Sequence, residues 1–438
     1  MTRSISRRHF LMSAAGTVAA AGLRAQPRVA ANDKLHVAVI GVAGQGVYNW
    51  SQLKTIPQCE VVALCDVHET RIGPAREAFP KATFDVDFRK TLERKGIDAV
   101  LIATPDHTHA HPTLMALRTG RHVYCEKPLT HTIEEARLVT ETAKREKRVT
   151  QMGTQIHAEK NYRRVVELIK AGAIGPVSEV HVWVGTSYST PGRPAGSEPV
   201  LPGLHWDLWL GPAPARPFHH GAAPDQFGTY LPFNWRRWWD FGGGAMTDMA
   251  CHYVDLPYWA LDLKYPVRVE ARGPQPHPES AAPWLIVEYL FPSRGEQPPV
   301  KLTWYDGGKK PDYIVRNKLN WGAGVLFVGT EGRMLLSDYG RHVLLPEKQF
   351  VDFKRPPQSI PDSIGHHREW VEACIKGEPT TTCDFSYSGP LAETAMLGVV
   401  AFRTGKALEW DAAHLKATNA PEADRYIRKE YRKGWELV

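Results

Sequence analysis

Three residues of this chain have side chains that could move a proton: Lys127, Asp248 and His252. Asp248 and His252 are four residues apart, so in a helix their side chains lie on one face. The carboxylate could then fix the tautomer of the imidazole, and a histidine with a pKa near ambient pH can take a proton from a hydroxyl group. The ammonium of Lys127 could stabilise the developing alkoxide. Taken singly, a surface lysine or a helical histidine bonded to its own neighbour is an ordinary structural feature.

A glycine-rich turn, Gly41-Val42-Ala43-Gly44-Gln45-Gly46, follows the strand-like run Leu35–Ile40. It fits the pattern G-x-G-x-x-G with Ala43 in the second glycine position and an additional glycine at Gly44. Glycine permits a tight turn and a close approach of the backbone to a pyrophosphate, which the first N–H groups of the next helix can bind. Alone, such a turn could be merely a tight loop. In this context we expect a dinucleotide site that includes Gly41, Ala43, Gly44, Gln45 and Gly46.

Asp66 supports the dinucleotide interpretation because it ends the second strand-like run, 20 residues after Gly46. A carboxylate at that position can accept hydrogen bonds from the adenosine ribose and repels a 2′-phosphate. This favours NAD over NADP. Arg71 lies close enough in sequence to soften the discrimination, so NADP remains possible.

A strand-to-helix turn at Ala103–His109 lies at the carboxyl edge of the expected sheet, where ligands bind in open α/β folds. We expect Thr104, Pro105 and His109 to border the cofactor. The alternating residues His107, His109 and His111 could also suggest a metal site. No carboxylate or thiolate has the spacing of a metal ligand, so no metal is expected.

The alternation of strand-like and helix-like segments predicts βαβ units and a doubly wound parallel Rossmann sheet in residues 32–152. From about residue 180, β-rich segments with Gly- and Pro-rich turns predict an α+β domain, residues 153–438, with a large, open, mostly antiparallel sheet. The expected strands are 35–40, 61–64, 99–103, 122–124, 149–152, 180–184, 267–272, 284–291, 300–304, 326–329, 333–336 and 407–410; the expected helices are 45–55, 88–95, 112–119, 133–147, 364–374 and 391–404.

Two motifs link these segments to a known family: Tyr124-Cys125-Glu126-Lys127-Pro128-Leu129, and the segment Gly242–Asp255 with its three glycines and Asp-x-x-x-His. Together with the closing Gly405-Lys406…Glu409-Trp410, they resemble the Gfo/Idh/MocA oxidoreductases over nearly the whole chain after residue 31. The resemblance implies that Glu126 and Lys127 lie beside the cofactor. It also implies that the helix carrying Asp248 and His252 faces the nicotinamide.

An insertion between about Ser187 and Trp239 is rich in Trp, Arg and Pro and is too long for an ordinary connection. Aromatic side chains cover the apolar C–H face of a sugar, and Arg, Asp or Asn bond its polar rim. The insertion therefore favours a carbohydrate substrate. These tryptophans could equally form the core of a long loop, so no individual contact is assigned.

The N-terminus has the pattern of a twin-arginine export signal: Arg7-Arg8 in Ser6–Leu11, then the mild apolar stretch Met12–Leu23. We expect residues 1–31 to be a signal peptide read by the Tat machinery, and the protein to be periplasmic. Removal of this segment lowers the formal charge from +7 to +2, which argues against a nucleic-acid partner. Because no later run approaches a membrane span, we expect a soluble protein without a stable membrane anchor.

The six cysteines have no Cys-x-x-Cys spacing and are expected to be free and buried.

Export constrains the chemistry, because an extracytoplasmic compartment has no soluble nicotinamide pool. We therefore expect a tightly bound cofactor that is recycled within each turnover. The protein could resemble the glucose–fructose oxidoreductases of the family, which oxidise one sugar and reduce another, or its redox-neutral NAD-dependent glycosidases. A non-catalytic nucleotide or sugar sensor is a third alternative. A homo-oligomer, a dimer or tetramer formed through the open sheet, is also expected.

Overall fold

The computed structural model describes residues 34–221, 228–378 and 380–437. The predicted export signal at residues 1–31 therefore lies outside the described residues. None of the helices in the described part of the chain is long and apolar enough to span a bilayer.

The N-terminal part folds around a six-stranded sheet in which every pair of neighbouring strands is parallel, in the order β3-β2-β1-β4-β5-β6. The strand order reverses between β1 and β4, which is where doubly wound sheets bind ligands. The predicted Rossmann fold is confirmed. The strands are β1 (Leu35–Ile40), β2 (Cys59–Cys65), β3 (Thr83–Asp85), β4 (Ala99–Ile102), β5 (His122–Glu126) and β6 (Thr150–Gly153); the helices are α1 (Gln45–Lys54), α2 (Gly73–Ala78), α3 (Phe88–Glu93), α4 (Ala110–Arg118) and α5 (Ile133–Glu146).

The second sheet has nine strands in the order β13-β12-β11-β7-β10-β9-β8-β14-β15. All of its pairs are antiparallel except β7 with β10, which are parallel. The predicted mostly antiparallel sheet is therefore confirmed. The strands are β7 (Glu179–Trp183), β8 (Arg268–Arg272), β9 (Ile286–Phe291), β10 (Val300–Tyr305), β11 (Gly324–Val328), β12 (Met334–Ser337), β13 (His342–Leu345), β14 (Leu408–Asp411) and β15 (Lys416–Ala417); the helices around it are α6 (Lys160–Lys170), α8 (Gly244–Tyr253), α9 (Asp255–Ala260), α10 (Asp312–Arg316) and α13 (Asp424–Ile427).

The outward face of the second sheet carries ion pairs between strands. Arg268 pairs with Glu409 at 2.5 Å, and Arg272 pairs with Glu288 at 2.5 Å. Such exposed pairs contribute little stability, but they make this face charged. Self-association through the sheet, which remains a prediction, would have to match these charges.

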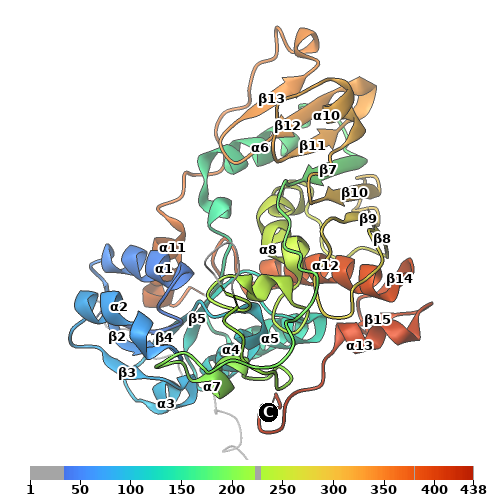
Figure 1. Cartoon of the computed structure of the whole chain (residues 1–438). Coiled ribbons are helices and arrows are strands. Elements are labelled where there is room, and N and C mark those ends of the chain that lie inside the picture. Colours follow the sequence, from blue (N-terminus) through green and yellow to red (C-terminus); the bar gives the residue numbers. More distant parts are fainter. Residues whose placement is uncertain (1–33, 222–227, 379, 438) are drawn as a thin grey trace, which may run out of the picture.

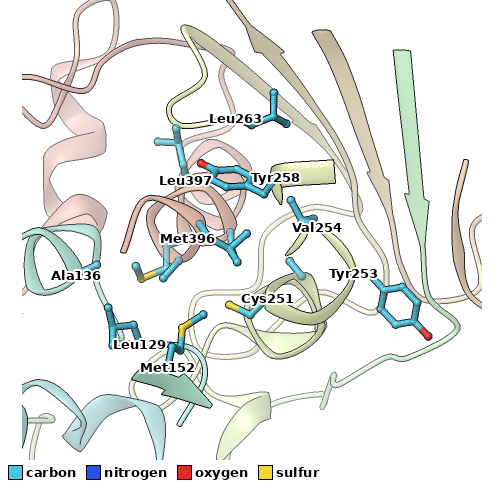
Figure 2. Close-up of a cluster of buried hydrophobic side chains, with 14 of the residues drawn as sticks. Leu129, Ala136, Met152, Cys251, Tyr253, Val254, Tyr258, Leu263, Met396 and Leu397 are labelled. Atoms are coloured by element: carbon cyan, nitrogen blue, oxygen red, sulfur yellow. The ribbon is translucent and has the colours of Figure 1, made fainter. Parts of the chain in front are cut away.

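Two helices near the C-terminus return to the first sheet (Figure 1). In α11 (His366–Lys376), Trp370 and Val371 are part of the hydrophobic core between β1, β2 and α1. The longer α12 (Phe385–Thr404) packs against both α5 and α8. Figure 2 shows the side chain of Cys251 on α8 directed into this shared core, near Met152 of β6 and Met396 of α12. The catalytic-helix candidate α8 is thus fixed by the cores of both sheets.

The insertion from residue 187 to 239 is anchored at the end of β2. The N–H of Glu69 donates to the carbonyl of Gly203 at 2.8 Å, and the N–H of His205 donates to the carbonyl of Val67 at 2.8 Å. Tryptophans of the insertion pack in a local core with Tyr230 and Phe241. Several tryptophans therefore belong to the core of this long loop, as the structural alternative for them predicted. The insertion also contains the short helix α7 (Trp206–Leu210), labelled in Figure 1.

All six cysteines are free, as predicted, and all except the half-buried Cys59 are buried.

Candidate active site

A main cavity of about 400 Å³ opens at the carboxyl edge of the parallel sheet. Its walls come from the turns after β1, β2, β4 and β5, from the insertion, and from Trp435 near the C-terminus. Ten of the twelve predicted cofactor-binding residues line it: Gly41, Ala43, Gly44, Gln45, Asp66, Arg71, Thr104, Pro105, Glu126 and Lys127.

The glycines of the glycine-rich turn have two different roles: some allow close packing of the backbone, and one faces the space where a ligand could bind. A Cβ on Gly41, which has φ +83°, would lie 2.6 Å from the carbonyl oxygen of Ala103, and a Cβ on Gly46 would lie 2.0 Å from the carbonyl oxygen of Gly41. Both glycines therefore allow close packing, and Gly46 does not line the cavity. Gly44, with φ +56°, faces open space. At the start of α1, which has no side-chain cap, the N–H groups of Gly46 and Val47 donate to the carbonyls of Ala43 and Gly44, whereas the N–H of Gln45 has no backbone acceptor among the described residues and is available to a phosphate.

Asp66 ends β2 at one end of the main cavity, and both of its carboxylate oxygens accept backbone hydrogen bonds. Oδ2 accepts from the N–H of Val42 at 3.0 Å, and Oδ1 accepts from the N–H of His68 at 3.0 Å. Burial raises the pKa of Asp66 despite these two bonds. The carboxylate is therefore held rigidly in place, with further lone pairs available to hydroxyl donors.

The turn after β4 contributes Thr104, whose Oγ1 is buried without a hydrogen-bond partner among the described residues. His109 does not line the cavity: its ring lies between two carbonyl groups, with Nδ1 2.8 Å from Pro128 O and Nε2 2.7 Å from Thr104 O. It links this turn to the turn after β5 instead of bordering a ligand. The neighbouring His107 and His111 bond the carbonyls of Trp209 and Trp435, and no metal-binding cluster is found in the described ranges.

Glu126 is 4 % exposed and is held by amide side chains. Its Oε1 accepts hydrogen bonds from Asn49 at 2.9 Å and from Gln155 at 2.8 Å, with a longer contact to Gln45 at 3.4 Å. Oε2 has no partner within the described part of the chain. Together with the Thr104 hydroxyl and the open backbone at Gly44, this unpaired oxygen fits a ligand with hydrogen-bond donors at one end and a pyrophosphate further along.

Lys127 and Asp248 form an ion pair at the inner end of the main cavity. Lys127 Nζ lies 2.5 Å from Asp248 Oδ1, and the two side chains are 12 % and 7 % exposed. Arg236 Nε also donates to Oδ1 at 3.1 Å, and the Tyr188 hydroxyl donates to Oδ2 at 3.0 Å. Burial by itself would raise the pKa of Asp248, but the charges of Lys127 and Arg236 outweigh it and hold the pKa well below its usual range. The carboxylate is thus ionised and fixes the lysine ammonium.

The expected partnership of Asp248 with His252 is wrong. The carboxylate is occupied by Lys127, Arg236 and Tyr188, and the Nδ1 atom of His252 is buried without a partner in the described residues. Burial and the charge of Lys127 lower the pKa of His252 to about 3, so the expectation of a pKa near ambient pH is also wrong. His252 is a neutral imidazole on the face of α8 that carries Asp248, but neither residue lines the cavity itself.

Sequence reasoning did not identify Asp106 as a functional residue. It is 2 % exposed and lines the main cavity, and its Oδ1 has no partner among the described residues. Burial raises the pKa of Asp106 well above its usual range, and the negative charge of Asp248 adds to the rise, while Arg236 and Lys127 oppose it. The site therefore contains one carboxyl group whose pKa is held low and one whose pKa is raised, a combination suited to acid–base chemistry.

Arg236 was also missed, although its segment was noted for its aromatic and basic residues. It lies in a short 3-10 turn, Asn234–Arg237, and its guanidinium packs 4.3 Å from the ring centroid of Phe233 and 4.2 Å from that of Trp235. These rings line the same cavity. The insertion thus delivers a cation and aromatic surfaces to the inner end of the cavity.

Comparison with known families matches the two parts of the chain to two domains of one oxidoreductase family. Residues 35–154 match the family described as "Oxidoreductase family, NAD-binding Rossmann fold", and residues 167–296 match its "C-terminal alpha/beta domain". The chain belongs to the Gfo/Idh/MocA family. The glycine-rich turn and Asp66, which line the main cavity, lie within the part of the chain that matches the NAD-binding domain.

Curated relatives include proteins named as glycosidases. An alpha-N-acetylgalactosaminidase of Shewanella oneidensis is 28 % identical over 203 residues, which cover 39 % of this chain and 44 % of the relative. A glycosyl hydrolase family 109 protein of Stenotrophomonas maltophilia is 34 % identical over 134 residues, covering 28 % and 30 %. The matches thus span less than half the length of these relatives.

Solved structures of sugar-related enzymes share the fold. The WlbA dehydrogenase of Bordetella pertussis, crystallised with NADH and UDP-GlcNAcA, has a TM-score of 0.59 at 18 % identity, covering 86 % of this chain and 99 % of that one. The myo-inositol 2-dehydrogenase of Lactobacillus plantarum has a TM-score of 0.54 at 15 % identity, covering 86 % and 100 %.

Proposed function

We propose that this protein is an NAD-dependent enzyme that transfers hydride to or from a secondary hydroxyl carbon of a sugar or polyol. The observation that carries this proposal is the ion pair between Lys127 and Asp248 at the inner end of the NAD cavity, 2.5 Å long and almost fully buried. A buried ammonium fixed by an ionised carboxylate is suited to hold a hydroxyl oxygen and to stabilise negative charge on it.

NAD supplies the hydride acceptor or donor when it is bound. Gly44 and the start of α1 would hold its pyrophosphate, and Asp66 would accept hydrogen bonds from its ribose. Lys127 would donate a hydrogen bond to the substrate hydroxyl. The neutral imidazole of His252 is free to accept a proton but has a low basicity in the unliganded site, since its pKa is lowered to about 3 by burial and by Lys127. The phenol of Tyr188 and the guanidinium of Arg236 keep Asp248 oriented.

A direct test incubates the purified protein, loaded with NAD, with a panel of free sugars and polyols and records the appearance of reduced nicotinamide. A pair of sugars, one oxidised and one reduced, is tested in parallel, because a retained cofactor needs a second substrate. If no compound gives reduced nicotinamide and no pair of sugars is interconverted, the result argues against this assignment.

A second candidate, a redox-neutral glycoside hydrolase, is favoured by the buried carboxyl group of Asp106, whose pKa is raised. In such a reaction, transient oxidation of a ring hydroxyl acidifies the neighbouring C–H, the aglycone is eliminated, water adds, and the hydride returns to the same molecule. Leaving-group departure benefits from a nearby acid, and the buried carboxyl of Asp106 lines the cavity and has a raised pKa. The glycosidase names of the curated relatives support the same candidate.

Solvent deuterium separates the two candidates. Cleavage of a nitrophenyl glycoside in D₂O by the redox-neutral route incorporates deuterium at the carbon next to the oxidised centre and leaves no net reduced cofactor. Hydride transfer between two sugars releases no nitrophenol and labels no such carbon. Mass spectrometry of the sugar product therefore assigns the reaction.

We also propose that the chain is exported by the twin-arginine route and carries its cofactor with it. The support is the Arg7-Arg8 pair and the apolar stretch that follows it. Denaturing the mature protein and measuring released NAD(H) and NADP(H) by mass spectrometry tests retention, and fractionation of the producing cells tests location. A near-stoichiometric yield of NAD(H) is expected, and protein purified without nucleotide would contradict the retained-cofactor proposal.

A further inference from the structure

A second cavity of about 530 Å³ lies apart from the main cavity. It is enclosed by the C-terminal end of α12, by residues 424–430 with α13, and by the turn from Trp239 to Gly243 that leads into α8. Its volume is in the range of small-molecule sites. The two cavities share no lining residue.

The side chain of Arg403 lies in this second cavity, packed between two aromatic rings. Its guanidinium carbon is 4.2 Å from the ring centroid of Tyr426 and 5.1 Å from that of Trp239. No acidic residue in the described ranges forms an ion pair with Arg403, and no hydrogen bond to it is found there. The rings stabilise the charge but leave the N–H donors of the planar fork unpaired.

The acidic groups around the cavity are engaged elsewhere or exposed. Asp240 binds Arg193 at 2.6 Å and Arg216 at 2.8 Å. Asp424 pairs with Arg428, and Glu430 is exposed at the rim. Asp240 attracts Arg403 electrostatically but is paired with two other arginines, so Arg403 brings to the cavity a positive charge without an ion-pair partner of its own among the described residues.

A second, independent observation is the hydroxyl of Thr247. This residue is 4 % exposed and lines the second cavity, and its Oγ1 atom is buried without a partner in the described part of the chain. It lies in the first turn of α8, where the helix dipole favours a negative charge. An unpaired donor and an unpaired cation therefore border the same space.

We propose that the second cavity binds a sugar-sized molecule through an oxyanion group, a carboxylate or a phosphate. Arg403 binds the oxyanion in its planar fork, Thr247 donates to it, and Trp239 and Tyr426 cover the apolar face of the molecule. The ligand would contact α8 at Thr247, one residue before Asp248. This binding is independent of the reaction proposed for the main cavity.

The electrostatics of the free protein agree with this proposal. Burial lowers the pKa of Arg403 to about 10; the charges of Tyr426 and Asp240 oppose this shift only in part, and no counter-ion in the described residues pairs with Arg403 directly. An oxyanion beside the guanidinium would supply that counter-ion.

The test is calorimetric titration of the full-length protein with D-glucuronate, glucose 6-phosphate, inorganic phosphate and glucose. Saturating NAD is present throughout, so that the phosphate-binding turn at Gly44 is closed to the probes. Saturable binding of glucuronate or glucose 6-phosphate is expected, with none for glucose. Comparison of glucuronate with glucose 6-phosphate tells whether the site prefers a carboxylate or a phosphate. If inorganic phosphate displaces the bound sugar anion, the oxyanion group provides most of the binding free energy.

Arg403→Met should weaken the binding of the preferred probe at least tenfold and leave the unfolding temperature nearly unchanged, because the half-buried charge that is removed has no ion-pair partner in the described part of the chain. The matched control is Arg316→Met, an exposed arginine of α10, which should not change binding. Thr247→Val, which keeps the shape of the side chain, should weaken binding about threefold or more and serves if the Arg403 variant does not fold. Failure of both sugar anions to bind, or binding unchanged in the Arg403 and Thr247 variants, would overturn the proposal.

Discussion

Each end of the main cavity has a carboxylate, Asp66 in the cavity wall at one end and Asp248 paired with the lining residue Lys127 at the other, and the two carboxylates are held in different ways. Asp66 is fixed by two backbone N–H groups, whereas Asp248 is fixed by Lys127, Arg236 and Tyr188. Backbone donors carry no net charge, so the first arrangement presents acceptors for recognition. The second arrangement keeps full charges in a nearly water-free place, where they act strongly on a reacting group. One end is therefore built for selection of the cofactor and the other for chemistry.

The largest effect on this contrast is expected from Lys127→Met. The change removes the ammonium while keeping the length of the side chain, and turnover should fall by about 10³-fold or more. Bound NAD should remain, since the turn at Gly44 and the carboxylate of Asp66 are untouched. Steady-state rates and the NAD content of the same preparation provide the measurement. A variant that loses its cofactor would show that Lys127 serves recognition and would remove the distinction between the two ends.

Asp106→Asn should have the next largest effect, about 10²-fold on glycoside cleavage, if the carboxyl donates a proton to the leaving group. Because burial raises the pKa of Asp106, the protonated form persists to higher pH than in an ordinary aspartate. Wild-type cleavage should therefore decline as the pH rises through that raised pKa, and this alkaline limb should disappear in the variant. A pH–rate profile with an activated and a poor leaving group is the measurement. An unchanged limb in the variant would assign it to another group.

Asp66→Ala should change the recognition of the cofactor and leave the catalytic rate almost unchanged. The ratio of NADP affinity to NAD affinity should rise about tenfold, equivalent to about 1.4 kcal/mol, because the variant loses ribose hydrogen bonds and no longer repels a 2′-phosphate. Competitive binding of the two nucleotides measures the ratio. The maximal rate with saturating NAD should stay within about twofold of the wild-type rate, and an unchanged affinity ratio would refute the role given to this carboxylate.

Tyr188→Phe should have the smallest effect. It removes one hydrogen bond to Asp248 while Lys127 and Arg236 remain, so the rate should fall by only about three- to tenfold, in line with the loss of one bond to a charged group. A much larger loss in the rate constant, without change in the NAD content, would indicate that the phenol itself contacts the substrate.

Much of this arrangement could be predicted from the sequence where it depends on local pattern. The bounds of β1 were predicted to the residue, and Asp66 and the predicted residues of the glycine turn, except Gly46, lie along the cavity wall. The short strand β3 was missed because it has only three residues, none of them buried. The parallel pairing of β7 with β10 was also missed, since the pattern of apolar residues does not reveal which strands are neighbours.

The wrong pairing of Asp248 with His252 and the failure to identify Asp106 have one physical origin. Sequence spacing reveals partners one helical turn apart, such as Asp248 and His252, but not partners brought together by folding. Lys127 is 121 residues away from Asp248 in sequence, and its Nζ atom nevertheless lies 2.5 Å from Asp248 Oδ1. His252, one helical turn from Asp248, is not among the hydrogen-bond partners found for that carboxylate in the described residues. Asp106 likewise is acted on by Arg236 and Asp248, which are far from it in sequence, so its raised pKa was not predictable from its sequence neighbours.

The burial of the cysteines has a chemical consequence for the lifetime of the protein. Oxidants and disulfides react with the thiolate form, and burial raises the pKa of Cys251 and of the half-buried Cys59 to about 12. Almost none of either thiol is therefore ionised near neutral pH, and five of the six sulfur atoms belong to buried residues. The folded chain should resist sulfenylation and mixed-disulfide formation, and alkylating reagents should label it mainly after unfolding. Thiol labelling would then report how often the native structure opens.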